Sequence, residues 1–192
     1  DVAARLTSKT MNTEKAELFT PAPEWSGRSD GPGPEHARWH SVINQSTESP
    51  APVTLLGFAS DEGVLRNGGR QGAAAGPAAL RSALGSLAVH HEHALADAGT
   101  ITTQADDLDG AHNALSDKVQ ELVAAGSLPI VLGGGHETAF GSHRGLYRAV
   151  GATKIINLDA HFDLRRADQA TSGTPFKQIS ELTDDFDYTV LG

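Results

Sequence analysis

Cysteine is absent from this chain of 192 residues, and its absence excludes several kinds of site. A disulfide, a thiolate metal centre and a cysteine nucleophile each require a thiol. Long apolar runs are absent too, because no stretch of the sequence approaches the roughly 20 apolar residues that a membrane-spanning helix needs. These two absences favour a protein of the cytoplasm with no membrane partner.

Basic residues are scarce relative to acidic ones: 15 Lys and Arg stand against 24 Asp and Glu, which gives a formal net charge of -9. A surface this acidic repels phosphate backbones, and the sequence contains no basic cluster interleaved with aromatic residues. The sequence therefore predicts no nucleic-acid partner. The hydrophobic fraction of 39% and the 21 glycines are ordinary for a globular chain that buries one sizeable core.

The chain changes character near residue 53. Residues 1–52 are polar, interrupted by proline and glycine, and carry both tryptophans, so we expect an N-terminal arm lying over a domain, with a short helix near 35–43. Residues 53–192 alternate short apolar runs with amphipathic stretches, which predicts a domain with a parallel α/β sheet. The expected strands are 53–58, 128–132, 154–158 and 187–191, with a weak one near 100–103. The expected helices are 77–88, 108–125, 136–150 and 175–182.

Two of the expected strands end in residues that can bind a metal. In an open parallel sheet, ligands bind beyond the carboxyl ends of the strands. At one such end, Gly133–Gly135 allow a sharp turn that delivers His136 to the edge of the sheet. At the other, Asp159, His161 and Asp163 point to one side if the stretch stays extended, because side chains alternate with period two. This set of carboxylates and imidazoles suits manganese better than a metal that prefers thiolates, although zinc, iron and cobalt also fit it.

Each of these features has a simpler interpretation when it is taken alone. The glycines could form an ordinary tight turn, His136 could cap its helix, and the Asp-x-His-x-Asp run could be a solvated loop. Their combination at two strand ends favours a metal site. Other segments are weaker candidates: the histidines of 90–93 are expected to be exposed, the acidic residues of 106–110 suit a helix N-terminus, and the glycines of 63–76 lack the GK[ST] of a phosphate loop.

The two metal-type segments resemble the metal motifs of the ureohydrolases, the arginase–agmatinase family: GGGHE at 133–137 and DAHFD at 159–163. The formimidoylglutamase branch of that family is the most similar. The similarity to this branch lies in four segments, DAHFDLR at 159–165, SGTPF at 172–176, NGGRQGAAAGP at 67–77 and WSGRSD at 25–30. The resemblance extends from about Trp25 to Gly192.

This resemblance implies a three-layer α/β/α arginase-like fold with a mostly parallel sheet. It also implies a hydrolase that converts N-formimidoyl-L-glutamate and water to L-glutamate and formamide, a step of histidine degradation. Two Mn²⁺ ions per complete active site would share a bridging hydroxide, which is the nucleophile. By motif position, His136 and Asp163 would bind one ion, His161 would bind the other, and Asp159 would bridge the two.

The resemblance also suggests residues for the amino-acid end of the substrate. Arg165 and Ser172 fall where relatives carry polar groups for it, and Arg70 is a further candidate, because a guanidinium fork matches a carboxylate. For both arginines the alternative is a residue that only braces a loop. Arginases carry a histidine in the loop that here reads SGTPF. Its absence argues against an arginase and leaves the proton donor open, with Glu137 and His143 as candidates.

A second departure from the family concerns the end of the chain. The family supplies two further metal-binding aspartates from an Asp-x-Asp motif on a later strand. The segment Asp185-Phe186-Asp187 has that spacing but precedes the last expected strand. We therefore expect the N-terminal portion of the fold, incomplete at the C-terminus and inactive alone. The alternatives are another ureohydrolase, such as an agmatinase, and a non-catalytic remnant. For the complete enzyme the resemblance implies a homo-oligomer.

Overall fold

The computed structural model describes residues 18–45, 51–90 and 94–192. The first part of the expected N-terminal arm and most of the histidine cluster at 90–93 therefore lie outside the described residues. No helix in the described ranges is long and apolar enough to cross a membrane.

Strands and helices alternate along most of the described chain, as the apolar pattern predicts. The strands are β1 (Phe19–Thr20), β2 (Val53–Ala59), β3 (Leu95–Thr102), β4 (Leu128–Leu132), β5 (Ile155–Leu158) and β6 (Tyr188–Leu191). The helices are α2 (Trp39–Val42), α3 (Glu62–Arg66), α4 (Gly76–Gly85), α5 (Leu108–Ala124), α6 (Thr138–Val150) and α7 (Pro175–Ser180), with 3-10 turns η1 (Pro34–His36) and η2 (Ala73–Ala75).

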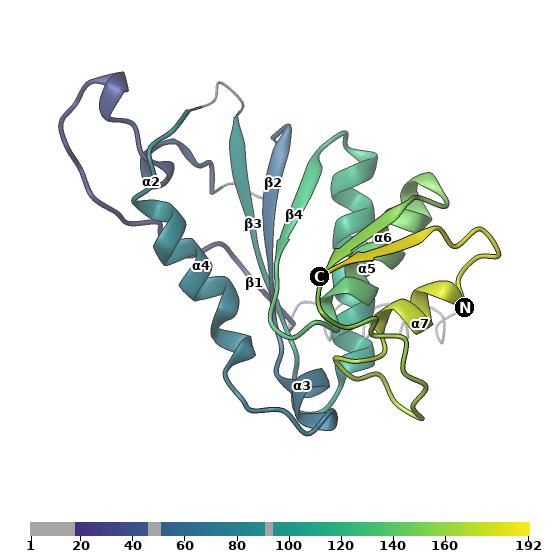
Figure 1. Cartoon of the computed structure of the whole chain (residues 1–192). Helices are drawn as coiled ribbons and strands as arrows, with labels where there is room; N and C mark the ends of the chain where they lie inside the picture. Colours follow the sequence, from purple (N-terminus) through teal and green to yellow (C-terminus); the bar gives the residue numbers. More distant parts are fainter. Residues whose placement is uncertain (1–17, 46–50, 91–93) are drawn as a thin grey trace, which may run out of the picture.

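The larger sheet has the strand order β1-β3-β2-β4, in which β2 runs parallel to both of its neighbours and only the short β1 is antiparallel. Helix α4 lies on one side of this sheet, and α5 and α6 lie on the other (Figure 1). Alternate residues of β2 explain the layers, because side chains along a strand point to opposite faces. Leu56 and Phe58 pack with Leu115 of α5, whereas Leu55 packs with Trp25 and Leu84 on the α4 side. The predicted α/β class is confirmed.

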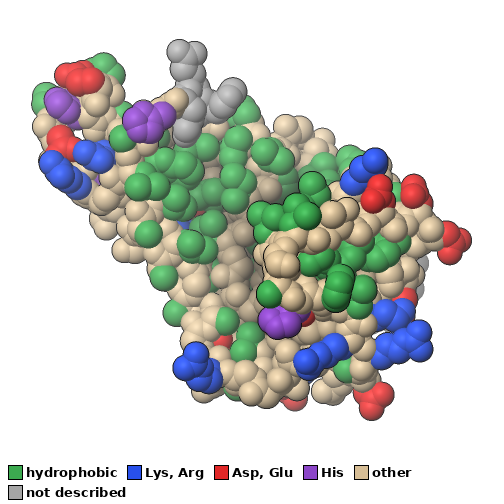
Figure 2. Space-filling view, in the orientation of Figure 1, with side chains coloured by type: hydrophobic (Ala, Val, Ile, Leu, Met, Phe, Trp, Pro, Cys, Tyr) green, Lys and Arg blue, Asp and Glu red, His purple; other side chains and the backbone are tan. Residues whose placement is uncertain are grey.

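The sheet is divided into two parts among the described residues. Strands β5 and β6 form a separate parallel pair, and neither is hydrogen-bonded to β4. Large apolar side chains are exposed on both sides of this division: Leu128 of β4 is 62% exposed, and Ile156 and Leu158 of β5 are 68% and 79% exposed. Figure 2 shows hydrophobic side chains gathered over this part of the surface. The four-stranded sheet is therefore a well-packed unit, and the β5–β6 pair stands beside it.

Strand β3 begins five residues earlier than the weak strand expected at 100–103. Its buried Asp97 accepts hydrogen bonds from Nε and Nη2 of Arg81, at 2.7 and 2.8 Å, and from Nε1 of Trp25 at 2.8 Å. A buried carboxylate is stable only when it is paired and hydrogen-bonded in this way. Because Arg81 faces the sheet, Leu80 of α4 points outward at 43% exposure, and Leu87, which follows the end of the helix, is 51% exposed.

Candidate metal centre

The turn after β4 is packed tightly against the end of β2. A side chain at Gly134 would lie 2.4 Å from the carbonyl oxygen of Ser60 and 3.0 Å from that of Phe58, so only glycine fits. The backbone N–H of Gly135 donates to the Ser60 carbonyl at 3.1 Å. These contacts fix the turn that places His136 just before α6, as the three glycines predict.

Glu137 follows His136 and lies fully inside the protein. Its Oε1 accepts a hydrogen bond of 3.0 Å from the N–H of Gly63, and burial raises the pKa of its carboxyl group. Its backbone carbonyl is 2.9 Å from Nε2 of His112, which stands between the rings of Phe58 and Phe140. Burial lowers the pKa of His112 to about 4, so this imidazole is neutral at pH 7. Glu137 and His112 therefore support the turn after β4, the first metal turn, from within the core.

The turn after β5 is more exposed than the turn after β4. It begins with the N–H of Asp159 donating to the carbonyl of Leu191 on β6 at 3.1 Å. The segment then bends instead of staying extended. Oδ1 of Asp159 accepts from the N–H of His161 at 2.8 Å, and Asp163 has φ 46°, in the left-handed region. The hydroxyl of Tyr188 donates to the carbonyl of Phe162 at 2.9 Å and holds the bend against β6.

Three of the four expected metal ligands converge where the two turns meet. Nδ1 of His136 lies 2.5 Å from Oδ2 of Asp163 and 3.2 Å from Oδ2 of Asp159. One ligand atom from each residue lies within 4.8 Å of the others. One imidazole nitrogen and two carboxylates form a donor set that suits a divalent cation such as Mn²⁺. The residues present therefore fit the expected metal.

The fourth expected ligand, His161, lies beside this cluster and does not belong to it. Its Nδ1 is 3.0 Å from Oδ1 of Asp159, but its side chain is 79% exposed. The hydrogen bonds from the N–H and the imidazole of His161 lower the pKa of Asp159 and keep its carboxylate ionised. His161 is thus held near the cluster by the bend and remains open on its other side.

Phe176 at the start of α7 connects the two turns. Its ring is 4% exposed, meets the His136 ring edge-on at 5.5 Å between centroids, and stacks on Tyr188 at 4.4 Å. Its N–H donates to the carbonyl of Asp163 at 3.2 Å. One buried aromatic side chain therefore contacts a ligand of the first turn and the strand that supports the second.

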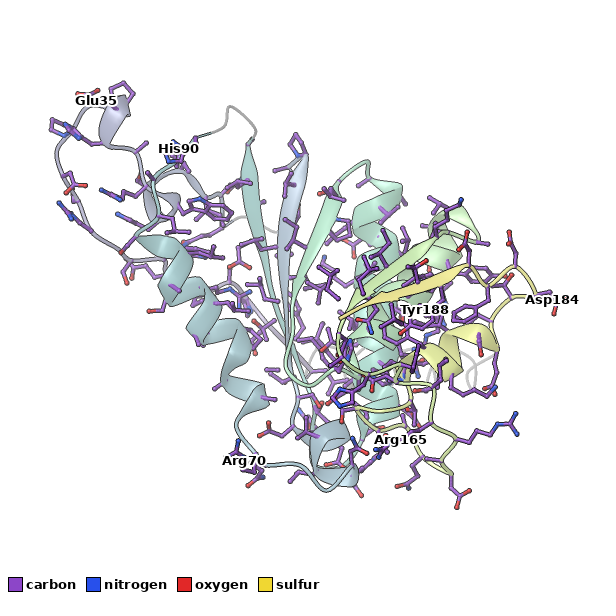
Figure 3. All side chains as sticks on the ribbon, viewed as in Figure 1. Glu35, Arg70, His90, Arg165, Asp184 and Tyr188 are labelled. Atoms are coloured by element: carbon purple, nitrogen blue, oxygen red, sulfur yellow. The ribbon has the colours of Figure 1, made fainter. Side chains whose placement is uncertain are left out.

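The residues expected at the amino-acid end of the substrate are divided between two places. Nη1 of Arg165 donates to Oδ1 of Asn67 at 2.8 Å, and Nδ2 of the same Asn67 donates to Oγ of Ser172 at 3.0 Å. Arg165 and Ser172 are therefore brought together. Arg70 is exposed on the loop before α4, and Figure 3 shows it on the opposite side of α3 from Arg165.

The candidate proton donors and the Asp-x-Asp segment do not join the cluster of His136, Asp159 and Asp163. The carboxylate of Glu137 is directed toward Gly63, and His143 lies on α6, where partial burial lowers its pKa. Asp185 and Asp187 precede β6, as expected, and neither belongs to the ligand cluster. Arg165 also borders a polar groove of about 630 Å³, but none of the three ligands lines it.

Known proteins named formimidoylglutamase are similar to this chain. It is 54% identical over 173 residues to a formimidoylglutamase of Corynebacterium efficiens, covering 88% of this chain and 55% of that protein. It is 51% identical over 160 residues to a formimidoylglutamase of Chromobacterium violaceum, covering 81% of this chain and 52% of that protein. The chain thus spans about half the length of the curated relatives it matches.

Solved structures agree with these relatives. A variant of formiminoglutamase from Trypanosoma cruzi, crystallised with Mn²⁺, superposes with a TM-score of 0.73 at 36% identity, over 81% of this chain and 56% of that one. A formimidoylglutamase of Bacillus subtilis, at 20% identity, shows the same fold with a TM-score of 0.69. The expected family resemblance and arginase-like fold are confirmed.

A sequence model of one protein family matches most of this chain. The model of the arginase family matches residues 51–192, which include both turns of the candidate metal centre. The chain therefore belongs to the arginase family.

Proposed function

We propose that this chain carries part of the active site of a manganese-dependent formimidoylglutamase. The reaction is the hydrolysis of N-formimidoyl-L-glutamate to L-glutamate and formamide, a step of histidine degradation. The observation that carries the proposal is the convergence of His136, Asp159 and Asp163 at two strand ends, in a chain of the arginase family about half identical to proteins named formimidoylglutamase.

Each residue of the cluster has a role in this proposal. His136 and Asp163 would hold one Mn²⁺ ion, His161 would hold the other, and Asp159 would contribute to both. When bound, the pair of ions supplies a water molecule acidic enough to attack an amidine carbon at neutral pH. The neutral His112 and the buried Glu137 keep the first turn fixed, so that His136 is held ready for its ion.

Arg165 supports an anionic substrate over a cationic one. Only its Nη1 has a hydrogen-bond partner within the described ranges, so Nε and Nη2 remain to donate to a carboxylate. An agmatinase substrate carries a cationic tail, which a guanidinium repels. This contrast favours formimidoylglutamate over agmatine. For Arg70, whose position is separate, the proposal requires the loop before α4 to approach the substrate.

The test uses the intact protein that carries this sequence, purified, loaded with Mn²⁺ and supplied with N-formimidoyl-L-glutamate. We expect glutamate release that is abolished by a chelator and by Asp163→Asn. Asp168→Asn is the matched control, because Asp168 is exposed on the same loop and lies outside the cluster. Urea release from agmatine would identify an agmatinase instead. Tight binding of Mn²⁺ by a folded protein without any hydrolysis would identify a non-catalytic relative.

The proposal includes a location and an assembly. The 192 residues carry no cysteine, which fits an enzyme of amino-acid degradation in the cytoplasm, and cell fractionation with an antibody to the chain tests this. A homo-oligomer is the assembly we propose for the enzyme, and light scattering of the purified protein measures it. A monomer at working concentration would contradict that part of the proposal.

A further inference from the structure

One asparagine links the two side chains proposed to receive the substrate's amino-acid end. Asn67 lies in the turn that follows α3, and its side chain is exposed. Its Oδ1 accepts from Nη1 of Arg165 at 2.8 Å, and its Nδ2 donates to Oγ of Ser172 at 3.0 Å. A carboxamide has one acceptor oxygen and one donor nitrogen. These two contacts therefore use the two ends of the same group and fix its orientation.

The backbone holds Asn67 against the ligand-bearing segments. The carbonyl of Gly63, at the start of α3, accepts from the N–H of Ser172 at 2.9 Å and from that of Asn67 at 3.2 Å. The N–H of Gly63 in turn donates to the buried Glu137, which is next to the ligand His136. The turn containing Asn67 is thus tied to the first metal turn and to the loop of Ser172.

Arg165 is exposed, and its side chain extends over Gly173 beside Asn67. Its N–H donates to the carbonyl of Gly173 at 3.0 Å. A Cβ added to Gly173 would lie 3.1 Å from Cδ of Arg165 and 3.5 Å from Nδ2 of Asn67, so these two side chains lie over this glycine. A long arginine side chain loses conformational freedom when it is held, and a group that already holds it lowers the cost of binding a ligand.

We propose that Asn67 is a positioning residue that presents Arg165 and Ser172 to the α-carboxylate or side-chain carboxylate of an amino-acid substrate. By binding Nη1 of Arg165, it leaves Nε and Nη2 for a bidentate contact with a carboxylate. By donating to Ser172, it directs the hydroxyl hydrogen of Ser172 outward as a further donor. Asn67 is neutral, so it orients the guanidinium without cancelling the charge that attracts the anion. The inference rests on the proposed function for the identity of the substrate.

The test compares Asn67→Ala with Asn113→Ala in the intact protein. Asn113 is a matched control, because its exposed Oδ1 accepts from an arginine, Arg144, at 2.8 Å outside the proposed site. We expect Asn67→Ala to raise KM for N-formimidoyl-L-glutamate on the order of tenfold, the cost of one poorly held charged contact, with kcat and Tm little changed. Asn113→Ala leaves KM unchanged. An unchanged KM in Asn67→Ala, with an active wild-type protein, overturns the inference and leaves the proposed function intact.

Two further variants separate positioning from a purely structural role. Asn67→Asp has the same size, can still accept from Arg165, and can accept from the Ser172 hydroxyl where Asn67 donates to it, so a structural role predicts wild-type behaviour. The positioning role predicts a raised KM, because the new carboxylate competes with the substrate for Arg165. In an Arg165→Ala background, Asn67→Ala should raise KM by clearly less than it does alone, because most of its effect acts through Arg165.

A binding measurement makes the outcome independent of turnover. Calorimetric titration with L-glutamate should show weaker binding to Asn67→Ala than to the wild type and Asn113→Ala. If the wild type is inactive but binds L-glutamate in this Asn67-dependent way, the inference stands and the proposed function fails. If Asn67→Ala binds L-glutamate as the wild type does, or if the wild type binds none, the inference fails.

Discussion

The two turns that supply the metal-type residues differ in how the protein holds them. The turn after β4 is enclosed: Gly134 lies against the backbone of β2, and Glu137 is fully buried. The turn after β5 follows a two-stranded sheet, and its Phe162 is 68% exposed. One half of the site is therefore shaped by the core, and the other half is shaped by local hydrogen bonds and by Phe176. Because the core holds only the turn after β4, His136 is preorganised, whereas Asp159 and Asp163 depend on contacts that a bound ion would strengthen.

The largest effect is expected from removing the aromatic side chain that joins the two turns. Phe176→Ala should lower the free energy of unfolding by about 3–5 kcal/mol, because it deletes a buried ring and leaves a cavity between His136 and Tyr188. Urea denaturation measures this change. Phe162→Ala is the control, since that ring is largely exposed, and it should change the free energy by less than about 0.5 kcal/mol. Equal effects of the two substitutions would show that Phe176 does not join the two turns.

The next effect concerns pH and the enclosed turn. The pKa of His112 is about 4 in the folded protein and 6.5 when unperturbed, so the unfolded chain binds a proton that the folded protein cannot take up in this range. The contribution of His112 to the free energy of unfolding is then fully present above pH 6.5 and falls by up to about 3 kcal/mol as the pH drops to 4. Denaturation of the wild type and of His112→Gln between pH 4 and 7 measures this, and the difference between them should shrink toward acid. A wild-type pH profile shared by His112→Gln would contradict the assignment.

The smallest effect is expected from the metal. At a manganese concentration about ten times the dissociation constant, binding should slow amide exchange roughly tenfold in the segments that only the ion orders. We expect this protection at residues 159–165 and little change at 133–137, which the core already fixes. Hydrogen exchange followed by mass spectrometry compares the two segments with and without a chelator. Equal protection of both turns would show that the turn after β4 also becomes ordered only when the metal binds.

The sequence predicts the strands flanking the site well, because those strands are short apolar runs between clear breakers. Residues 128–132 form β4 as expected, and residues 154–158 shift by one residue to β5. Strand β3 was harder to predict, since Asp97 and Gly99 disfavour a strand by composition. Its burial depends on Arg81, 16 positions away, whose pairing with Asp97 cannot be read from either segment alone.

The site is predicted unevenly for a similar reason. The glycine turn follows from the sequence, because no side chain fits beside β2. Residues 159–163 do not stay extended, which was the condition for their side chains to point to one side, because the carboxylate of Asp159 accepts from the N–H of His161 and competes with the strand conformation. Asp159 and Asp163 nevertheless converge on His136. The contact between Asn67 and Arg165 joins residues 98 positions apart through two loops, and no periodic pattern signals such a pair.

The divided sheet has a consequence for handling the 192-residue chain produced alone. In the described part of the chain, β4 and β5 each have a hydrogen-bonded neighbour on one side only. They carry exposed apolar side chains, such as Ile130 in β4 and Ile156 in β5. Open strand edges of this kind recruit strands from other molecules and promote aggregation. Solubility of the 192-residue chain produced alone should therefore fall steeply with its concentration, and Ile156→Lys, on the solvent side of β5, should raise the concentration at which light scattering first increases.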